Sequence, residues 1–185
     1  SKIGYSTAFT VFYIIIFPML GGGDPYMVNF TIFFIPWFFG YMLAIFMGSD
    51  ITVKGKEKLM IFKKSPDGIW KLVSSKFMRS FILGLPLALA ITLVMRFMYG
   101  LNISETFITL GFSLVSLATS LATCIGLFSI NPAFKERSSK FGINMLIFTG
   151  IGMSEFMIPI LLTPYIGFSL EAWGLTTMLL AVIIS

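Results

Sequence analysis

The chain has 185 residues, of which 57% are hydrophobic and only 11% are charged, and its net charge is +5. A soluble domain carries roughly 25% charged residues, and a small domain buries only about two thirds of the surface that its unfolded chain exposes. This composition excludes an ordinary soluble domain and predicts that much of the apolar surface lies in lipid.

The chain contains no histidine and one cysteine, Cys124, which lies in an apolar run. These counts exclude a disulfide within the chain, the usual Cys/His zinc site and a catalytic triad that needs histidine. We expect no metal site and interpret Cys124 as a small packing residue. The positive charge is concentrated beside apolar segments, so it indicates membrane topology and not binding to nucleic acid.

About 20 apolar residues are needed to cross the hydrocarbon core of a bilayer as a helix. By this measure the sequence predicts an all-α membrane protein, a single domain over residues 1–185 with six spans. In chain order the predicted spans cover residues 3–20, 27–48, 77–97, 105–130, 141–162 and 170–185. Because the first span begins two residues into the sequence and the sixth ends with it, we expect a piece, or one half, of a longer protein.

Prolines and small residues shape several of these spans. Pro36 and Pro86 lie inside the second and third spans and are expected to bend them, because proline removes a backbone donor and crowds the preceding turn. Asn131–Pro132 is expected to end the fourth span, and Thr163–Pro164 the fifth. The fourth span is rich in Ser, Thr, Ala and Gly, which allow helices to approach closely in lipid.

Basic residues predict the orientation. The segment 50–79 holds eight of the 13 Lys and Arg residues, and the loop 131–140 holds Lys135, Arg137 and Lys140. Together with Lys2 they place twelve basic residues on one side of the membrane, against Arg96 alone on the other. By the positive-inside rule both loops and both termini are cytoplasmic, in a multi-pass protein of the cell membrane.

The segment 50–79 has its own local pattern. Residues 57–64 read as a short amphipathic helix, and Ser65 to Gly68 as a turn whose Asp67 can cap the next segment. Residues 69–79 have apolar positions at helical spacing and include Trp70, a residue typical of the membrane interface. We expect an amphipathic helix along the membrane surface that bends into the third span. It either holds topology and touches anionic lipid, or docks a cytoplasmic partner.

At this point the chain resembles a known family. A loop after the second span carries lysines and Glu57, then Ser65–Pro66, then a helix with Lys76 that leads into the third span. This pattern resembles the permease domain of type-2 ATP-binding-cassette (ABC) exporters. A second loop, with Asn131–Pro132, Phe134 and Lys135, resembles the archaeal and bacillary branch of that family.

The resemblance implies a transport function that is shared between chains. It implies a coupling segment that sits in a cleft of a cytoplasmic ATPase, made of Glu57, Ser65, Pro66, Asp67, Trp70, Lys71 and Lys76. It also implies a second permease half or an identical copy as a partner. The sequence has no phosphate-binding loop of the Gly-x-x-x-x-Gly-Lys-Ser/Thr type, so ATP and magnesium would be bound by the ATPase, and this chain is expected to be neither an enzyme nor a cofactor carrier.

Two charged residues lie in predicted spans. Glu155 lies well inside the fifth span, where an ionised group costs about 2.5 to 3.5 kcal/mol on insertion scales. It either lines a substrate path or is a structural group, protonated or bonded to Ser154, to a threonine of another helix or to Arg96. Arg96 either reaches water at the end of its span or pairs with Glu105.

Two further classes of function remain open. An ATPase-independent secondary transporter or channel would carry ions or protons through Glu155 and Arg96. A non-transporting membrane scaffold, such as an assembly or immunity factor, would need neither residue. The sequence does not indicate the substrate.

Overall fold

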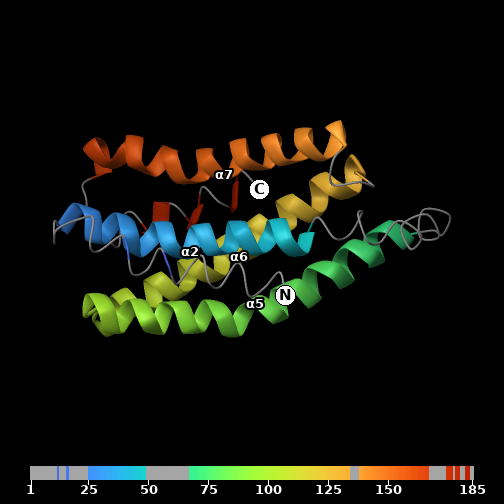
Figure 1. The fold of residues 1–185 in the computed structure, drawn as a ribbon. Coiled ribbons are helices and arrows are strands. Elements are labelled where there is room, and N and C mark those ends of the chain that lie inside the picture. The colour runs from blue at the N-terminus through green and yellow to red at the C-terminus, as the bar shows by residue number, and fades with distance from the viewer. Residues whose placement is uncertain are drawn as a thin grey trace.

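The computed structural model describes residues 12, 16, 25–48, 67–133, 138–166, 174–176, 178–179 and 182–183. Within these residues the regular structure is helical. It consists mainly of four long helices: α2 (Pro25–Gly48), α5 (Gly68–Tyr99), α6 (Ile103–Ile130) and α7 (Ser139–Ile166) (Figure 1). The predicted all-α fold is therefore confirmed for this part of the chain.

Three of these helices are long and apolar enough to cross a membrane: α2 from Phe30 to Gly48, α5 and α6. They coincide with the second, third and fourth predicted spans, so the expectation of a membrane protein is supported. The fifth predicted span falls on α7. The first and sixth spans lie mostly outside the described residues, as does the short helix predicted at 57–64. The number of six spans therefore stays a prediction.

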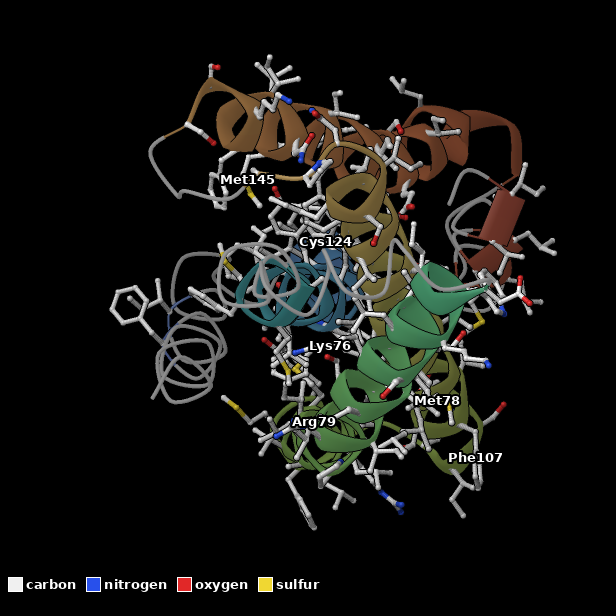
Figure 2. All side chains as sticks on the ribbon, turned by 90° about the vertical axis from the view of Figure 1, so that its right-hand side faces the viewer. Lys76, Met78, Arg79, Phe107, Cys124 and Met145 are labelled. Atoms are coloured by element: carbon white, nitrogen blue, oxygen red, sulfur yellow. The ribbon has the colours of Figure 1, made fainter. Side chains whose placement is uncertain are left out.

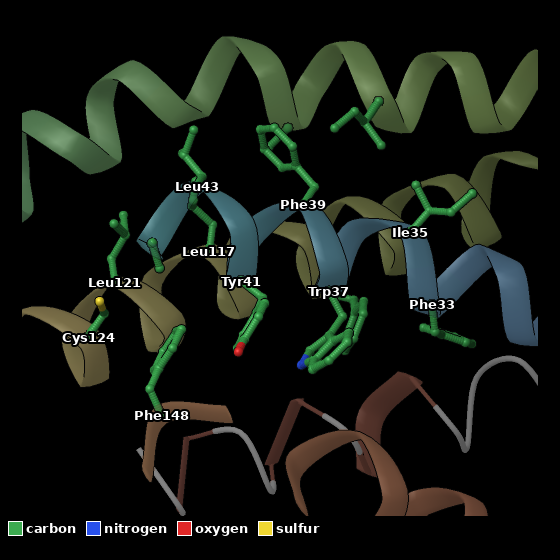
Figure 3. Packing of buried hydrophobic residues seen from close by; sticks show 14 of the residues in the cluster. Phe33, Ile35, Trp37, Phe39, Tyr41, Leu43, Leu117, Leu121, Cys124 and Phe148 are labelled. Carbon is green, nitrogen blue, oxygen red and sulfur yellow. The ribbon is translucent and has the colours of Figure 1, made fainter. Parts of the chain in front are cut away.

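Helix α2 lies in the centre of the bundle. It is apolar on every side, which is typical of a helix that is buried all round. Figure 3 shows its side chains diverging to different neighbours, with Phe39 and Leu43 directed toward α5 and Trp37 and Tyr41 toward α7. The packing of the other helices is organised around this one.

The backbones of α2 and α6 approach each other closely. A Cβ atom added at Gly40 would lie 3.1 Å from both the backbone nitrogen and the Cα of Leu117. Nearer the end of α2, a Cβ added at Gly48 would lie 2.8 Å from the Sγ of Cys124, which is buried. Glycines of α2 thus permit this close packing against α6, and Cys124 is a packing residue.

Helix α5 is longer than the predicted third span. Its 32 residues begin at Gly68, so the amphipathic segment and the span form one uninterrupted helix. Figure 1 shows α5 changing direction near its middle. Pro86 lies inside the helix and explains the bend, because a proline removes a hydrogen bond and crowds the turn before it.

One predicted helix end is correct and another is wrong. Helix α6 ends at Ile130, directly before Asn131–Pro132, as expected. Helix α7 continues through Pro164 to Ile166, so the expectation that Thr163–Pro164 closes the fifth span is wrong. Prolines are tolerated inside helices of membrane proteins, where neighbouring groups satisfy the backbone acceptor that they leave free.

Candidate functional site

The described part of the predicted coupling segment is the first turns of α5. Trp70 is 73% exposed and Lys71 is also exposed, whereas Lys76 is half-buried. Glu57, Ser65 and Pro66 lie outside the described residues. The structure therefore presents an aromatic ring and a lysine at the start of a long helix.

Asp67 does not cap α5 as predicted. It occupies the N-cap position, but its side chain makes no capping hydrogen bond. Its backbone is left-handed, with φ 56°, whereas a capping residue has an extended backbone that directs its side chain to the first turn. Its carbonyl oxygen still accepts a hydrogen bond from the backbone nitrogen of Lys71 at 3.0 Å.

The basic residues of α5 do not share one face. Figure 2 shows Met78 on one side of α5 and Lys76 and Arg79 on the other. Lys71 lies seven residues before Met78 and therefore follows the same stripe of the helix surface. The structure thus separates Lys71 from Lys76, which the sequence analysis had grouped together.

A groove lies between the start of α5 and the second half of α6. Its volume is about 450 Å³, and its lining is almost entirely apolar. The lining residues are Trp70, Val73, Ser74, Phe77, Met78, Ala122, Ile125 and Gly126. Figure 1 shows why it forms, since α5 and α6 diverge toward the start of α5. No sequence pattern indicates this groove, because the groove depends on the direction of α5 after its bend.

The described part of the second loop has a structural role. The side-chain nitrogen of Asn131 donates to Oδ1 of Asn144 at 2.9 Å, and Nδ2 of Asn144 donates to the carbonyl oxygen of Asn131 at 2.7 Å. Asn144 is buried, and the pair joins the end of α6 to α7. Pro132 follows this junction, while Phe134 and Lys135 lie outside the described residues. The sequence analysis missed Asn144, although an amide inside an apolar span was the available signal.

Glu155 is only 4% exposed and lies on the side of α7 that faces α2. Gly152 identifies this side of α7, because a Cβ added there would lie 3.2 Å from the ring of Tyr41 and 3.4 Å from that of Trp37, both on α2. Glu155 follows Gly152 by three residues, so it lies near the same face. The sequence analysis had not connected Glu155 with these aromatic residues.

None of the pairings proposed for Glu155 and Arg96 is found among the described residues. The hydroxyl of Ser154 donates to the carbonyl oxygen of Ile151 at 2.7 Å and not to Glu155. Glu105 forms a capping box with Asn102, in which Glu105 Oε2 accepts from the backbone nitrogen of Asn102 at 2.8 Å. Arg96 is exposed in the last turn of α5 and forms no ion pair within this part of the chain.

An aromatic stack connects α2 to α7. The rings of Trp37 and Tyr41 stack with centroids 5.4 Å apart, and those of Tyr41 and Phe148 with centroids 4.7 Å apart. Figure 3 shows Tyr41 and Phe148 facing each other from the two helices. This contact was not predicted, because an aromatic residue in an apolar span gives no indication of its partner.

No protein-family model, no curated protein and no solved structure matches the chain.

The geometry therefore offers two kinds of site. The exposed start of α5 presents an aromatic ring and a cation on a rigid helix, which suits the binding of a protein or of the lipid surface. Near the α2–α7 contact, α7 carries the buried carboxyl group of Glu155, which suits the passage or binding of a cation.

Proposed function

We propose that this chain is the membrane-spanning permease subunit of an ABC-type exporter, which couples ATP hydrolysis by a partner ATPase to the export of a substrate. The observation that carries the proposal is the continuity of α5 from Gly68 to Tyr99. It joins the exposed Trp70 and Lys71 to a membrane span without a break.

The length of α5 supports this role. Its 32 residues extend over about 48 Å at 1.5 Å per residue, whereas the hydrocarbon core of a bilayer is about 30 Å thick. If α5 stands near the bilayer normal, roughly 12 residues project beyond the core, which matches the polar part from Gly68 to Arg79. A partner that contacts Trp70 would thus push on a helix that continues into the membrane.

The part of α5 from Ser80 to Ala88 is packed tightly enough to transmit a displacement of the helix to α2 and α6. Its buried residues Ser80, Gly84 and Ala88 recur at the spacing of one helix face. A Cβ added at Gly84 would lie 2.7 Å from a methyl group of Leu117 and 2.9 Å from one of Leu43. With so little free space, movement of α5 displaces α2 and α6 as well.

The remaining features of the proposal follow from the charge distribution and the resemblance. The helix ends that flank the two basic loops lie at one end of the bundle, which agrees with two cytoplasmic loops (Figure 1). The chain would be multi-pass in the cell membrane, with both termini inside. ATP and magnesium would bind to the ATPase, and a second permease half or a second copy would complete the transporter.

The test compares two exposed aromatic residues at opposite ends of α5. Trp70 and Phe97 are 73% and 83% exposed, respectively. The protein is coexpressed with the ABC ATPase encoded nearest to it and purified through a tag on this chain. We expect the ATPase to copurify, Trp70→Ala to reduce its recovery, and Phe97→Ala to leave it unchanged. Failure of any ABC ATPase to copurify, or an equal loss in both variants, would refute the proposal.

A second candidate function is ion- or proton-coupled transport without an ATPase, and the buried Glu155 favours it. Glu155 is buried three residues after Gly152, the residue of α7 that contacts Tyr41 and Trp37, and it has no ion-pair partner in the described part of the chain. The purified protein would be reconstituted alone in vesicles with an ion gradient. Transport that Glu155→Gln abolishes, and that needs no ATPase, would select this function over the first.

A further inference from the structure

The groove between α5 and α6 is apolar, and within the described part of the chain no residue fills the space beside Gly126. Its walls are the side chains from Trp70 to Met78 on one helix and from Ala122 to Gly126 on the other. Among the lining residues only Ser74 carries a hydroxyl group that is free to face a ligand. A Cβ added at Gly126 would meet no atom within 4 Å. A slot of this kind suits a long, flexible apolar chain.

The position of the groove along the helices points to the membrane interface. Ala122 and Gly126 lie one to two turns before the end of α6 at Ile130. On α5 the groove occupies the first turns, from Trp70 to Met78, where the polar part of the helix meets its apolar part. The slot therefore lies at the depth where phospholipid headgroups meet their acyl chains. Trp70, with its amphipathic ring, is suited to this depth.

Basic residues predominate on α5, and the exposed Asp67 directly precedes the helix. Helix α5 contains Lys71, Lys76, Arg79 and Arg96 and no acidic residue. Lys71 is not one of the lining residues, but it lies three residues before Ser74, which places it beside the face of α5 that lines the groove. Arg79 follows Trp70 by nine residues, so it lies on the opposite side of the helix. A lysine at this place binds a phosphate while its stem follows the apolar wall.

We infer that the groove is a binding site for an anionic phospholipid, with one acyl chain between α5 and α6 and the phosphate at Lys71. The apolar walls recognise the chain, and Lys71 selects an anionic headgroup over a zwitterionic one. The bound lipid fills the space that the bend of α5 opens and so supports the position of the projecting helix. The inference goes beyond the proposed function and does not depend on an ATPase.

The test measures lipid binding by native mass spectrometry of the purified protein in detergent. Dioleoylphosphatidylglycerol and dioleoylphosphatidylcholine are titrated separately, and the fraction of protein with one bound lipid is recorded. We expect phosphatidylglycerol to bind more tightly. Gly126→Leu should weaken the binding of phosphatidylglycerol about tenfold or more, because the leucine displaces several methylene groups of the acyl chain. Lys71→Gln should weaken it about fivefold, the effect of one basic residue near an anionic surface.

Two matched variants control the test. Gly150→Leu makes the same change at a helical glycine of α7 that also has no atom within 4 Å of an added Cβ. Arg79→Gln removes a cation from the same helix on a different side. Both should bind phosphatidylglycerol like the unchanged protein. Should Gly126→Leu not fold, the Lys71→Gln and Arg79→Gln pair still decides the question.

Three outcomes would overturn the inference. The first is equal binding of the two lipids, and the second is equal weakening by Lys71→Gln and Arg79→Gln. The third is unchanged lipid binding by Gly126→Leu together with a shift between one and two copies in the same spectra, which would make the groove an interface between copies. Because no ATPase is present, none of these results bears on the proposed exporter function.

Discussion

The hydroxyl groups of Tyr41 and Thr149 lie 2.6 Å apart and connect α2 to α7. Thr149 already donates its proton to the carbonyl oxygen of Met145 at 2.8 Å, so Tyr41 is the donor between the two helices. The ring of Tyr41 also stacks on Phe148, with only 2° between the ring planes. One residue thus supplies both a polar and an aromatic contact to α7.

Removal of this hydroxyl should destabilise the protein modestly. Tyr41→Phe keeps the ring stack and loses one hydrogen bond, which contributes about 0.5 to 1.5 kcal/mol. Thr149→Val should cost more, because it leaves the buried Tyr41 hydroxyl without its acceptor. The free energy of unfolding is measured by denaturant titration in mixed micelles. A larger loss in Tyr41→Phe than in Thr149→Val would contradict the assignment of the donor.

The close approach of the α2 and α6 backbones at Gly40 leads to a second prediction. In a helix, Gly→Ala normally stabilises by about 1 kcal/mol. At Gly40 the added Cβ would press on the backbone of Leu117 at 3.1 Å, and overpacking of this kind costs about 1 to 3 kcal/mol. Gly40→Ala should therefore lower the unfolding free energy measured in micelles.

Gly150→Ala is the control for the Gly40 variant. An added Cβ at Gly150 meets no atom within 4 Å, so helix propensity alone should act and stabilise the protein. If the two variants change stability in the same direction, the close approach of α2 to α6 does not exist in the protein.

The sequence predicted helix positions well where composition and local signals decide them. The second span was predicted at 27–48, and α2 covers Pro25–Gly48. The end of α6 at Ile130 followed from Asn131–Pro132. The prediction from Pro164 was wrong because a proline does not always end a helix, and α7 continues past this one to Ile166. Hydropathy detects the apolar run and proline detects a break, but neither shows whether tertiary contacts override the break.

The site was harder to predict than the helices. Trp70 and Lys71 were selected from sequence, and both lie exposed at the start of α5. The groove beside them was not predicted, because it depends on how far the bend of α5 carries it from α6. The contacts of Tyr41 with Thr149 and Phe148 join residues more than a hundred positions apart. Periodicity shows that a face is apolar, but it does not show which helix covers that face.

The amide pair at the end of α6 makes a third prediction. Asn144 is buried and exchanges two hydrogen bonds with Asn131. Asn144→Ala removes both and leaves the Asn131 groups without partners, so we expect a loss of about 2 kcal/mol of unfolding free energy. Asn131→Ala keeps its backbone carbonyl as an acceptor and should cost about half as much. Equal stability of all three proteins would show that the pair does not hold α7 to α6.

The last prediction concerns Gly100, the residue that ends α5. Its φ is +64°, and its backbone nitrogen donates to the carbonyl oxygen of Arg96. An added Cβ would meet no atom within 4 Å, so any loss on substitution comes from the backbone conformation alone. Gly100→Ala should destabilise by about 1 to 2 kcal/mol, the cost of a left-handed conformation for a residue with a Cβ.

Gly100→Asn separates this effect from a general effect of adding a side chain. Asparagine adopts the left-handed conformation more readily than alanine, so it should lose less stability although it is larger. Gly142→Ala, inside α7 with open space around an added Cβ, should be neutral or stabilising. The comparison uses thermal unfolding in the same detergent. A Gly100→Asn variant that is less stable than Gly100→Ala would mean that this turn is not left-handed, and α5 and α6 would then be joined differently.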